Sequence, residues 1–91
     1  MNIHINVRTW LDHETGQYIA HALPIDVASH GPTPDAAKTA LDEAVRAFVA
    51  AAKAHGTLEE VMEECGYQRR GDDWIAPALV SAEDRLLTTV G

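Results

Sequence analysis

One segment of the chain, residues 33–56, combines start, stop and periodicity signals for a single long helix. Thr33-Pro34-Asp35 supplies a hydroxyl N-cap, a proline suited to the first helical position and a carboxylate where the helix dipole is positive. His55-Gly56 closes the segment with glycine, the residue that most easily adopts the left-handed conformation after a helix. A helix over residues 34–54 is about 31 Å long at about 1.5 Å per residue.

Apolar side chains recur in this segment at intervals of three and four residues, which places them on one side of the helix. They are Ala37, Leu41, Ala44, Val45, Phe48, Val49 and Ala52. A different side carries Lys38, Asp42 and Arg46, at spacings where opposite charges attract. Because such a helix is stable only when its apolar side is packed, the rest of the chain must supply a partner surface. Phe48 is expected in the resulting core.

The first thirty residues predict that this partner surface is a β-sheet. Ile3, Ile5, Val7, Thr9 and Leu11 alternate with Asn2, His4, Asn6, Arg8 and Trp10. A strict period of two is typical of a strand with two different faces. Residues 12–16 favour a turn, residues 17–23 are again extended, and residues 27–30 predict a short third strand after Pro24. The first two strands should form a hairpin, with Ile3, Ile5 and Val7 toward the helix.

The remaining residues predict a short helix, a small hairpin and a last strand. Thr57 and Glu60 have the spacing of a capping box, so a second helix is expected up to Gly66. Residues 67–75 favour a small hairpin or ordered loop with Tyr67 and Trp74 as packing anchors, and residues 84–90 favour a final strand. The expected fold class is therefore α+β in the order β-β-β-α(-α)-β, a single domain over residues 1–91 with a mainly antiparallel sheet covered by helix on one face.

Too few helices are predicted to cover both faces of the sheet, so one face is left open. An antiparallel register that pairs odd with even residues places six candidate interface residues there: His4, Arg8, Trp10, Ile19, His21 and Leu23. This mixture of aromatic, aliphatic and basic groups is typical of an interface. Burying a few hundred Å² contributes several kcal/mol at roughly 25 cal/mol/Å², which is enough for self-association into a dimer or tetramer. The alternative is a solvated face, as in many antiparallel sheets.

The charge of the chain restricts its partners and its location. The formal net charge is −7, from 14 acidic and 7 basic residues. Nucleic-acid binding needs a basic surface, so nucleic acid is not an expected partner of this chain alone, and a basic protein is favoured. There is no apolar run near the ~20 residues of a membrane span and no signal-peptide pattern. The single cysteine, Cys65, fits a reducing interior. A cytoplasmic location is expected.

The residue types used in catalysis occur here without the spacing that catalysis requires. His4, His21 and His30 lie on neighbouring strands, but zinc needs three or four convergent ligands, and no helical histidine pair or tight Cys/His spacing is present. We interpret these histidines as surface or interface residues. Cys65 is interpreted as a packed thiol, and the four glutamates of residues 59–64 as a solvated helix face. No enzyme activity, metal or cofactor is expected.

Several motifs occur in an order found in a known family. They are GQYIAHALP at residues 16–24, SHGPTPDAA at 29–37 and LDEAV at 41–45, followed by GTLEEVMEECGY at 56–67 and WIAP at 74–77. The first three resemble the N-terminal domain of HicB-like antitoxins, in which a glycine-tyrosine strand precedes a threonine-capped, alanine-rich helix. The last two are similar to an extension found in a solitary HicB-like branch. The resemblance covers nearly the whole chain.

The resemblance implies both a fold and a partner. It implies a β-β-β-α-β domain related to half of a ribonuclease H fold or to a double-stranded-RNA-binding fold, assembled into dimers or tetramers. It also implies that the chain neutralises a small basic toxin that cleaves messenger RNA, by masking the toxin's catalytic histidine.

The chain departs from the family in two places. Residues 24–27, Pro-Ile-Asp-Val, replace the family's proline-glycine-cysteine-like turn, and no C-terminal DNA-binding module is recognised. DNA binding by this chain is therefore not implied. A solitary member without a toxin leaves a second hypothesis open, an orphan oligomeric scaffold or regulatory subunit.

Overall fold

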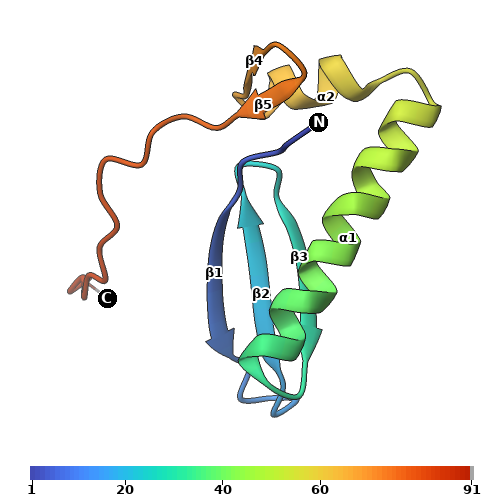
Figure 1. Ribbon diagram of the computed structural model, residues 1–91. Coiled ribbons are helices and arrows are strands. Elements are labelled where there is room, and N and C mark those ends of the chain that lie inside the picture. Colours follow the sequence, from blue (N-terminus) through green and yellow to red (C-terminus); the bar gives the residue numbers. More distant parts are fainter. Residues whose placement is uncertain (91) are drawn as a thin grey trace.

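The computed structural model describes residues 1–90, and Gly91, the last residue of the expected domain, lies outside them. The elements are β1 (Asn6–Leu11), β2 (Tyr18–Leu23), β3 (Val27–Gly31), α1 (Pro34–Ala54), α2 (Leu58–Glu64), β4 (Gln68–Arg70) and β5 (Asp73–Ile75) (Figure 1). The predicted α+β class is confirmed: a three-stranded antiparallel sheet, a long helix, a short helix and a two-stranded second sheet. Within residues 1–90, every helix is too short or too polar to cross a membrane.

Helix α1 has the bounds that its sequence signals predict. The Thr33 hydroxyl accepts a hydrogen bond from the Ala36 amide at 3.1 Å, and Pro34 occupies the first turn. At the other end, Gly56 has a φ of +71°, a left-handed conformation that glycine adopts without strain. The amides of Gly56 and Thr57 donate to the carbonyls of Lys53 and Ala52, which completes a Schellman cap.

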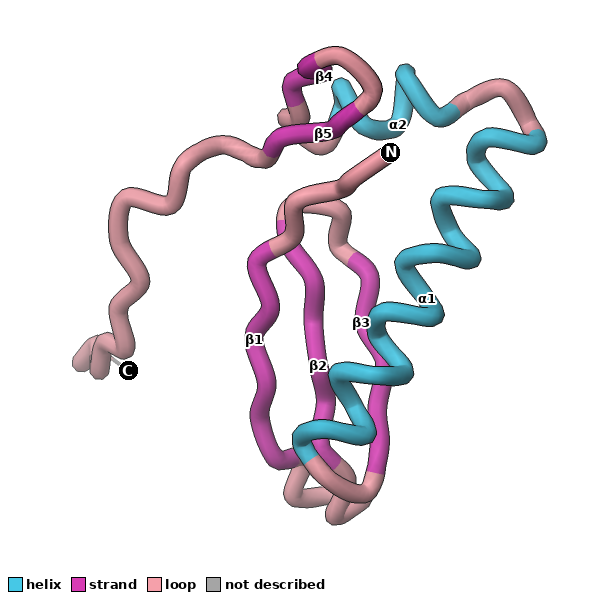
Figure 2. The backbone as a smooth tube through the Cα atoms, in the orientation of Figure 1, coloured by secondary structure: helices cyan, strands magenta, loops and turns pink. Residues whose placement is uncertain are grey.

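The sheet has the strand order β1-β2-β3, and α1 packs mainly on β3 and β2, with little contact to β1 (Figure 2). Small residues lie under the helix. Ala20 and Ala22 are fully buried, and a Cβ added to Gly31 would lie 2.7 Å from the Ala37 backbone nitrogen. The absence of larger side chains at these positions lets the helix approach the sheet closely.

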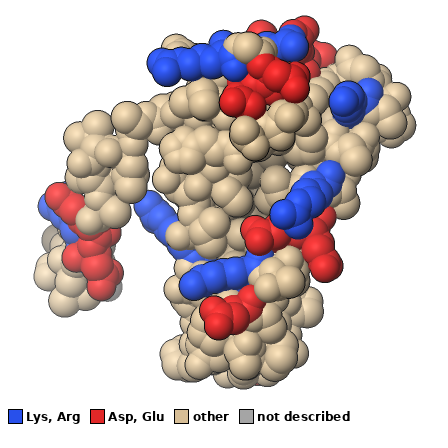
Figure 3. All heavy atoms as spheres, in the orientation of Figure 1, with Lys and Arg blue, Asp and Glu red and all other residues tan. Residues whose placement is uncertain are grey.

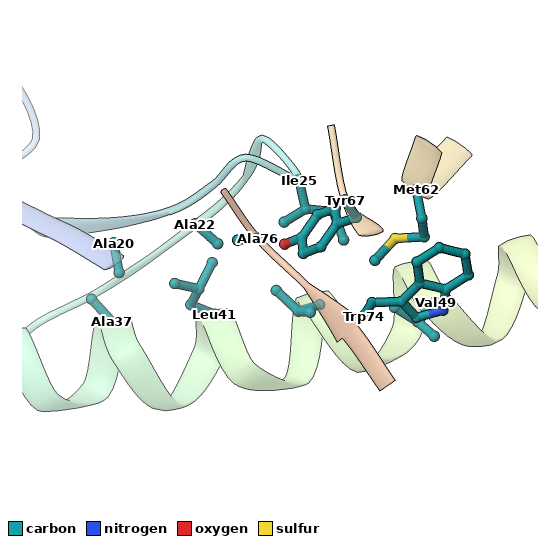
Figure 4. Close-up of a cluster of buried hydrophobic side chains, with 11 residues drawn as sticks. Ala20, Ala22, Ile25, Ala37, Leu41, Val49, Met62, Tyr67, Trp74 and Ala76 are labelled. Carbon is teal, nitrogen blue, oxygen red and sulfur yellow. The ribbon is translucent and has the colours of Figure 1, made fainter. Parts of the chain in front are cut away.

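The C-terminal hairpin joins the same core through its two predicted anchors. Tyr67 and Trp74 are only 4% and 3% exposed, and they lie near Met62 and Val49 in one hydrophobic cluster (Figure 4). Backbone hydrogen bonds also tie β5 to the N-terminal segment, because the His4 amide donates to the Trp74 carbonyl at 3.0 Å and the Trp74 amide donates to the Asn2 carbonyl at 2.9 Å. The prediction that residues 67–75 form a hairpin with these anchors is confirmed.

The expectation that Phe48 belongs to the core is wrong, since its side chain is 37% exposed. The buried positions Ala37, Leu41, Val45 and Val49 are spaced by four residues, so they move around the helix by about 40° per step at 3.6 residues per turn. The C-terminal end of α1 approaches α2 (Figure 1), and Val49 packs in the same cluster as Met62. By this point the buried side has turned away from Phe48, which lies about 100° around the helix from Val49.

Three further expectations are corrected. Thr57 makes no capping hydrogen bond to α2, because its hydroxyl donates to the Ala52 carbonyl at 3.3 Å and so belongs to the end of α1. Val7 is exposed rather than packed, since β1 lies beyond the area that α1 covers. Residues 84–90 do not form the predicted final strand; residues 76–90 contain neither helix nor strand.

Candidate protein-binding surface

The side of the three-stranded sheet opposite α1 is its open face. Trp10 is paired with Ile19, Arg8 with His21, and Asn6 with Leu23. Successive residues of a strand point to opposite sides, and Ala20 and Ala22 point to the helix. The intervening Ile19, His21 and Leu23, and their partners on β1, therefore share the open face. The odd-with-even register expected from the sequence is the one observed.

Trp10 is the largest side chain on the open face and is 46% exposed. Its ring meets the His21 ring edge-on, with the centroids 6.3 Å apart and an interplanar angle of 88°. His21 Nε2 in turn shares a hydrogen bond of 2.6 Å with Asp26 Oδ1, in the turn between β2 and β3. This chain of contacts restricts the tryptophan before any partner arrives, which lowers the entropy that binding costs.

A shallow hollow of about 340 Å³ lies at the β1–β2 turn end of the open face and is lined by Asp12, Thr15, Gln17, Ile19 and His30. His30 Nδ1 shares a hydrogen bond of 2.7 Å with Gln17 Oε1. His30 is opposite Ile19 in the β2–β3 register, so it lies on the open face. His30, interpreted from the sequence as a surface or interface histidine, was not among the six candidates of the open face, although the alternation of β3 places it there. Gln17 had no such signal.

His4 is the one candidate that the structure separates from the others. It precedes β1, in the segment whose backbone pairs with Trp74, and its carbonyl accepts a hydrogen bond from the Tyr67 hydroxyl at 2.7 Å. The backbone of His4 therefore holds the C-terminal hairpin in place. Arg8, Trp10, Ile19, His21 and Leu23 remain together.

Acidic and basic groups lie side by side over the α2–β4–β5 end of the molecule (Figure 3). Arg69 bridges two of its elements, because its guanidinium donates to the Glu59 carboxylate and lies 5.8 Å from the Trp74 ring centroid. Glu60, Glu63 and Glu64 line an open hollow beside Gly56. The acidic excess at this end is exposed to solvent and available to a basic partner.

Among residues 1–90, the His, Cys, Asp and Glu side chains form no group of three that could hold a metal ion. Cys65 is partly buried against the hydrophobic cluster. Burial raises the pKa of Tyr67 to about 12, and the nearby Cys65 thiolate adds to this shift. At neutral pH Tyr67 is therefore a neutral hydrogen-bond donor that supports the fold.

The open face therefore combines a half-exposed aromatic ring opposite Ile19, a second aliphatic side chain, Leu23, farther along β2, and polar groups held by hydrogen bonds. Comparisons of the chain with models of known families, with curated proteins and with solved structures found no match.

Proposed function

We propose that the protein is a non-catalytic binding protein, specifically a cytoplasmic HicB-like antitoxin that neutralises a small basic mRNA-cleaving toxin by protein–protein contact. The observation that carries the proposal is the open face, where Trp10 stands half-exposed opposite Ile19. The order of β1, β2, β3 and α1 agrees with the domain that the family motifs imply, and Thr33 of those motifs is the N-cap of α1.

The composition of the open face suits a protein partner. Tryptophan and arginine are the residues most enriched among those that dominate binding energy, and they act best when surrounded by groups that exclude water. Trp10 is paired with Ile19, and Arg8 lies two residues before it on the same face of β1. A partner that covers these side chains removes apolar surface from water at roughly 25 cal/mol per Å².

The charge of the chain suits a basic partner. Its net charge of −7 attracts a basic protein over a distance of about a Debye length, roughly 10 Å at 0.1 M salt. Near the open face, Asp26 is exposed in the turn after β2 and Asp12 lies in the turn after β1. Acidic groups at the edge of a partly apolar surface steer association, so the association rate with the toxin should fall as salt rises.

The test is co-expression with a small basic toxin encoded next to the gene. The wild-type chain should restore growth and co-purify with the toxin, whereas Trp10→Ala should lose both. Phe48→Ala is the matched control, because it also removes a partly exposed aromatic ring, but from α1. Equal rescue by the two variants, or the absence of a complex with the wild-type chain, would overturn the proposal.

A second candidate function, an orphan oligomeric scaffold or regulatory subunit, is favoured by one further observation. Large apolar side chains are exposed outside the open face as well, among them Leu86 and Leu87. This function requires self-association without a toxin. Light scattering on the purified chain distinguishes the two: a scaffold is an oligomer on its own and binds no toxin, and Trp10→Ala weakens its contact through the open face.

A further inference from the structure

Residues 77–90, the C-terminal arm, leave β5 and contain neither helix nor strand (Figure 1). Its large apolar side chains are among the most exposed in the molecule. They are Leu79, Val80, Leu86, Leu87 and Val90, with exposed fractions from 63% to 105%. The end of the arm, Leu-Leu-Thr-Thr-Val at residues 86–90, is rich in β-branched residues, which favour strands.

Strand β1 offers an unpaired edge. In the order β1-β2-β3 it bonds only to β2, and α1 lies mainly over β3 and β2. Edge strands that must stay unpaired usually contain proline, lysine or inward charges. The sequence of β1, Asn-Val-Arg-Thr-Trp-Leu, contains no proline or lysine, and its Val7, Trp10 and Leu11 are exposed. This edge is open to pairing with another strand.

Within its own chain the end of the arm passes beyond this edge. Ile3 and Trp74 form a parallel bridge, an offset of 71 residues, so continuing that register puts residue 77 opposite Asn6 and residue 82 opposite Leu11. Residues 83–90 would then extend beyond the end of β1. The most strand-like part of the arm, with Leu86 and Leu87, therefore has no edge to reach in its own protomer.

We propose that two copies of the chain exchange their C-terminal arms, so that residues 84–90 of each copy add a strand to the free β1 edge of the other. The arm spans about 46 Å at about 3.3 Å per residue, which is long enough to reach a neighbouring protomer. The only charged residue of β1 is Arg8, whereas the arm contains Glu83 and Asp84, which are of opposite charge. A reciprocal exchange buries both arms in one two-fold interface, so its area is doubled.

The first test introduces charge into the arm of the full-length chain. Leu86→Asp with Leu87→Asp should weaken the dimer measured by sedimentation equilibrium by about 100-fold or more, because both arms lose their apolar contacts. Ser81→Asp with Ala82→Asp is the control, since it adds the same charge to the same arm without removing a large apolar side chain. The control should keep the wild-type dissociation constant to within about threefold. At a concentration low enough for the wild-type chain to be monomeric, both variants should retain its melting temperature.

The second test locates the arm in the partner. In a Cys65→Ser background, a chain with Val7→Cys is mixed with a differently tagged chain that carries Leu86→Cys, Leu87→Cys or Thr88→Cys. Oxidation should give a disulfide that joins the two differently tagged chains for at least one of the three arm positions. Thr39→Cys on the exposed side of α1 replaces Val7→Cys in the control, and it should give none.

Three results would overturn arm exchange. The first two concern the dimer: a wild-type chain that is monomeric, or a dissociation constant that Leu86→Asp with Leu87→Asp leaves unchanged. The third concerns the crosslink: no disulfide between the two chains, although a single chain that carries both cysteines forms one. The proposal does not depend on the antitoxin function. Trp10→Ala changes the open face and should leave the crosslink to the β1 edge intact, whereas the two arm aspartates should leave toxin binding intact.

Discussion

Tyr67 connects two ends of the chain through one buried hydroxyl. It comes directly after α2, is almost fully buried, and donates a hydrogen bond of 2.7 Å to the carbonyl of His4. Its ring packs in the hydrophobic cluster with Met62 and Trp74 (Figure 4). Because the phenolate cannot donate this hydrogen bond and loses hydration when buried, the fold holds Tyr67 in its neutral form.

This buried phenol predicts a loss of stability at alkaline pH. In the unfolded chain Tyr67 releases its proton near pH 10.0, whereas in the folded chain its pKa is about 12. The stabilisation is complete below pH 10 and falls as the pH rises toward 12, by roughly 2–3 kcal/mol in total. Urea unfolding at pH 9, 10 and 11 should show this slope in the wild type and a flatter one in Tyr67→Phe. Parallel pH curves for the two proteins would contradict the assignment.

Gly31 predicts a steric effect rather than an electrostatic one. It is buried at the end of β3, and an added Cβ would lie 2.7 Å from the Ala37 nitrogen and 2.8 Å from the Ala36 carbonyl carbon, both backbone atoms of α1. Gly31→Ala should therefore destabilise the fold by about 1–3 kcal/mol, because the helix must move away from the sheet. Ala28→Ser, at an exposed position of the same strand, should change the unfolding free energy little. If both variants unfold at the same urea concentration, α1 does not pack as closely on β3 at Gly31 as the structure indicates.

At the scale of elements, the start of α1 was predictable because its cap is local in sequence. Thr33→Ala removes the hydroxyl that accepts from the Ala36 amide and should cost about 1 kcal/mol. Thr39→Ala lies on the exposed side of the same helix and should be neutral or slightly stabilising, since alanine is the better helix former. Thermal melts of the two variants should move in opposite directions or differ clearly. A Thr33→Ala melt at the wild-type temperature would show that the cap contributes nothing.

The buried side of α1 was only partly predictable from the sequence, and the difference between a buried and an exposed position of its apolar stripe can be measured. Leu41 is fully buried between the helix and the sheet, so Leu41→Ala should cost about 2–5 kcal/mol by leaving a cavity. Phe48 has the same helical periodicity but is 37% exposed, so Phe48→Ala should cost less than half as much. Urea unfolding of both variants gives the ratio. A larger cost for Phe48→Ala would place Phe48 back in the core.

Periodicity identified the elements but not what lies next to each of them. The three- and four-residue spacing that marks α1 includes Phe48, yet it contains no information about where the sheet ends. In the same way, Thr57 and Glu60 have the spacing of a capping box, but the end of α1 uses Thr57 for its own cap. The strand-like pattern of residues 84–90 requires a neighbouring strand to pair with, and among residues 1–90 this segment pairs with none.

At the scale of the whole molecule, the open face was predictable because two local facts combine. Strict alternation fixes which side chains share a face, and an odd-with-even register then brings Trp10 next to Ile19 and Arg8 next to His21. His4 precedes β1, and alternation alone does not show where β1 begins. The Trp10–His21–Asp26 contacts were not predictable, since Asp26 reaches His21 only through the turn between β2 and β3.

Replacing Trp10 should affect binding to a partner more than it affects the stability of the fold. Its ring is half-exposed and lies outside the hydrophobic cluster, and its one aromatic neighbour is His21. Trp10→Ala should therefore change the free energy of unfolding by only about 1 kcal/mol, the size of one edge-on aromatic contact. The same variant should weaken binding to the partner of the open face by about 2 kcal/mol or more, as for a central tryptophan in an interface. Isothermal titration and urea unfolding on the same samples measure the two quantities. If Trp10 instead supports the fold, Trp10→Ala should lower the free energy of unfolding and leave the free energy of binding almost unchanged. That result would place Trp10 in the fold rather than in an interface.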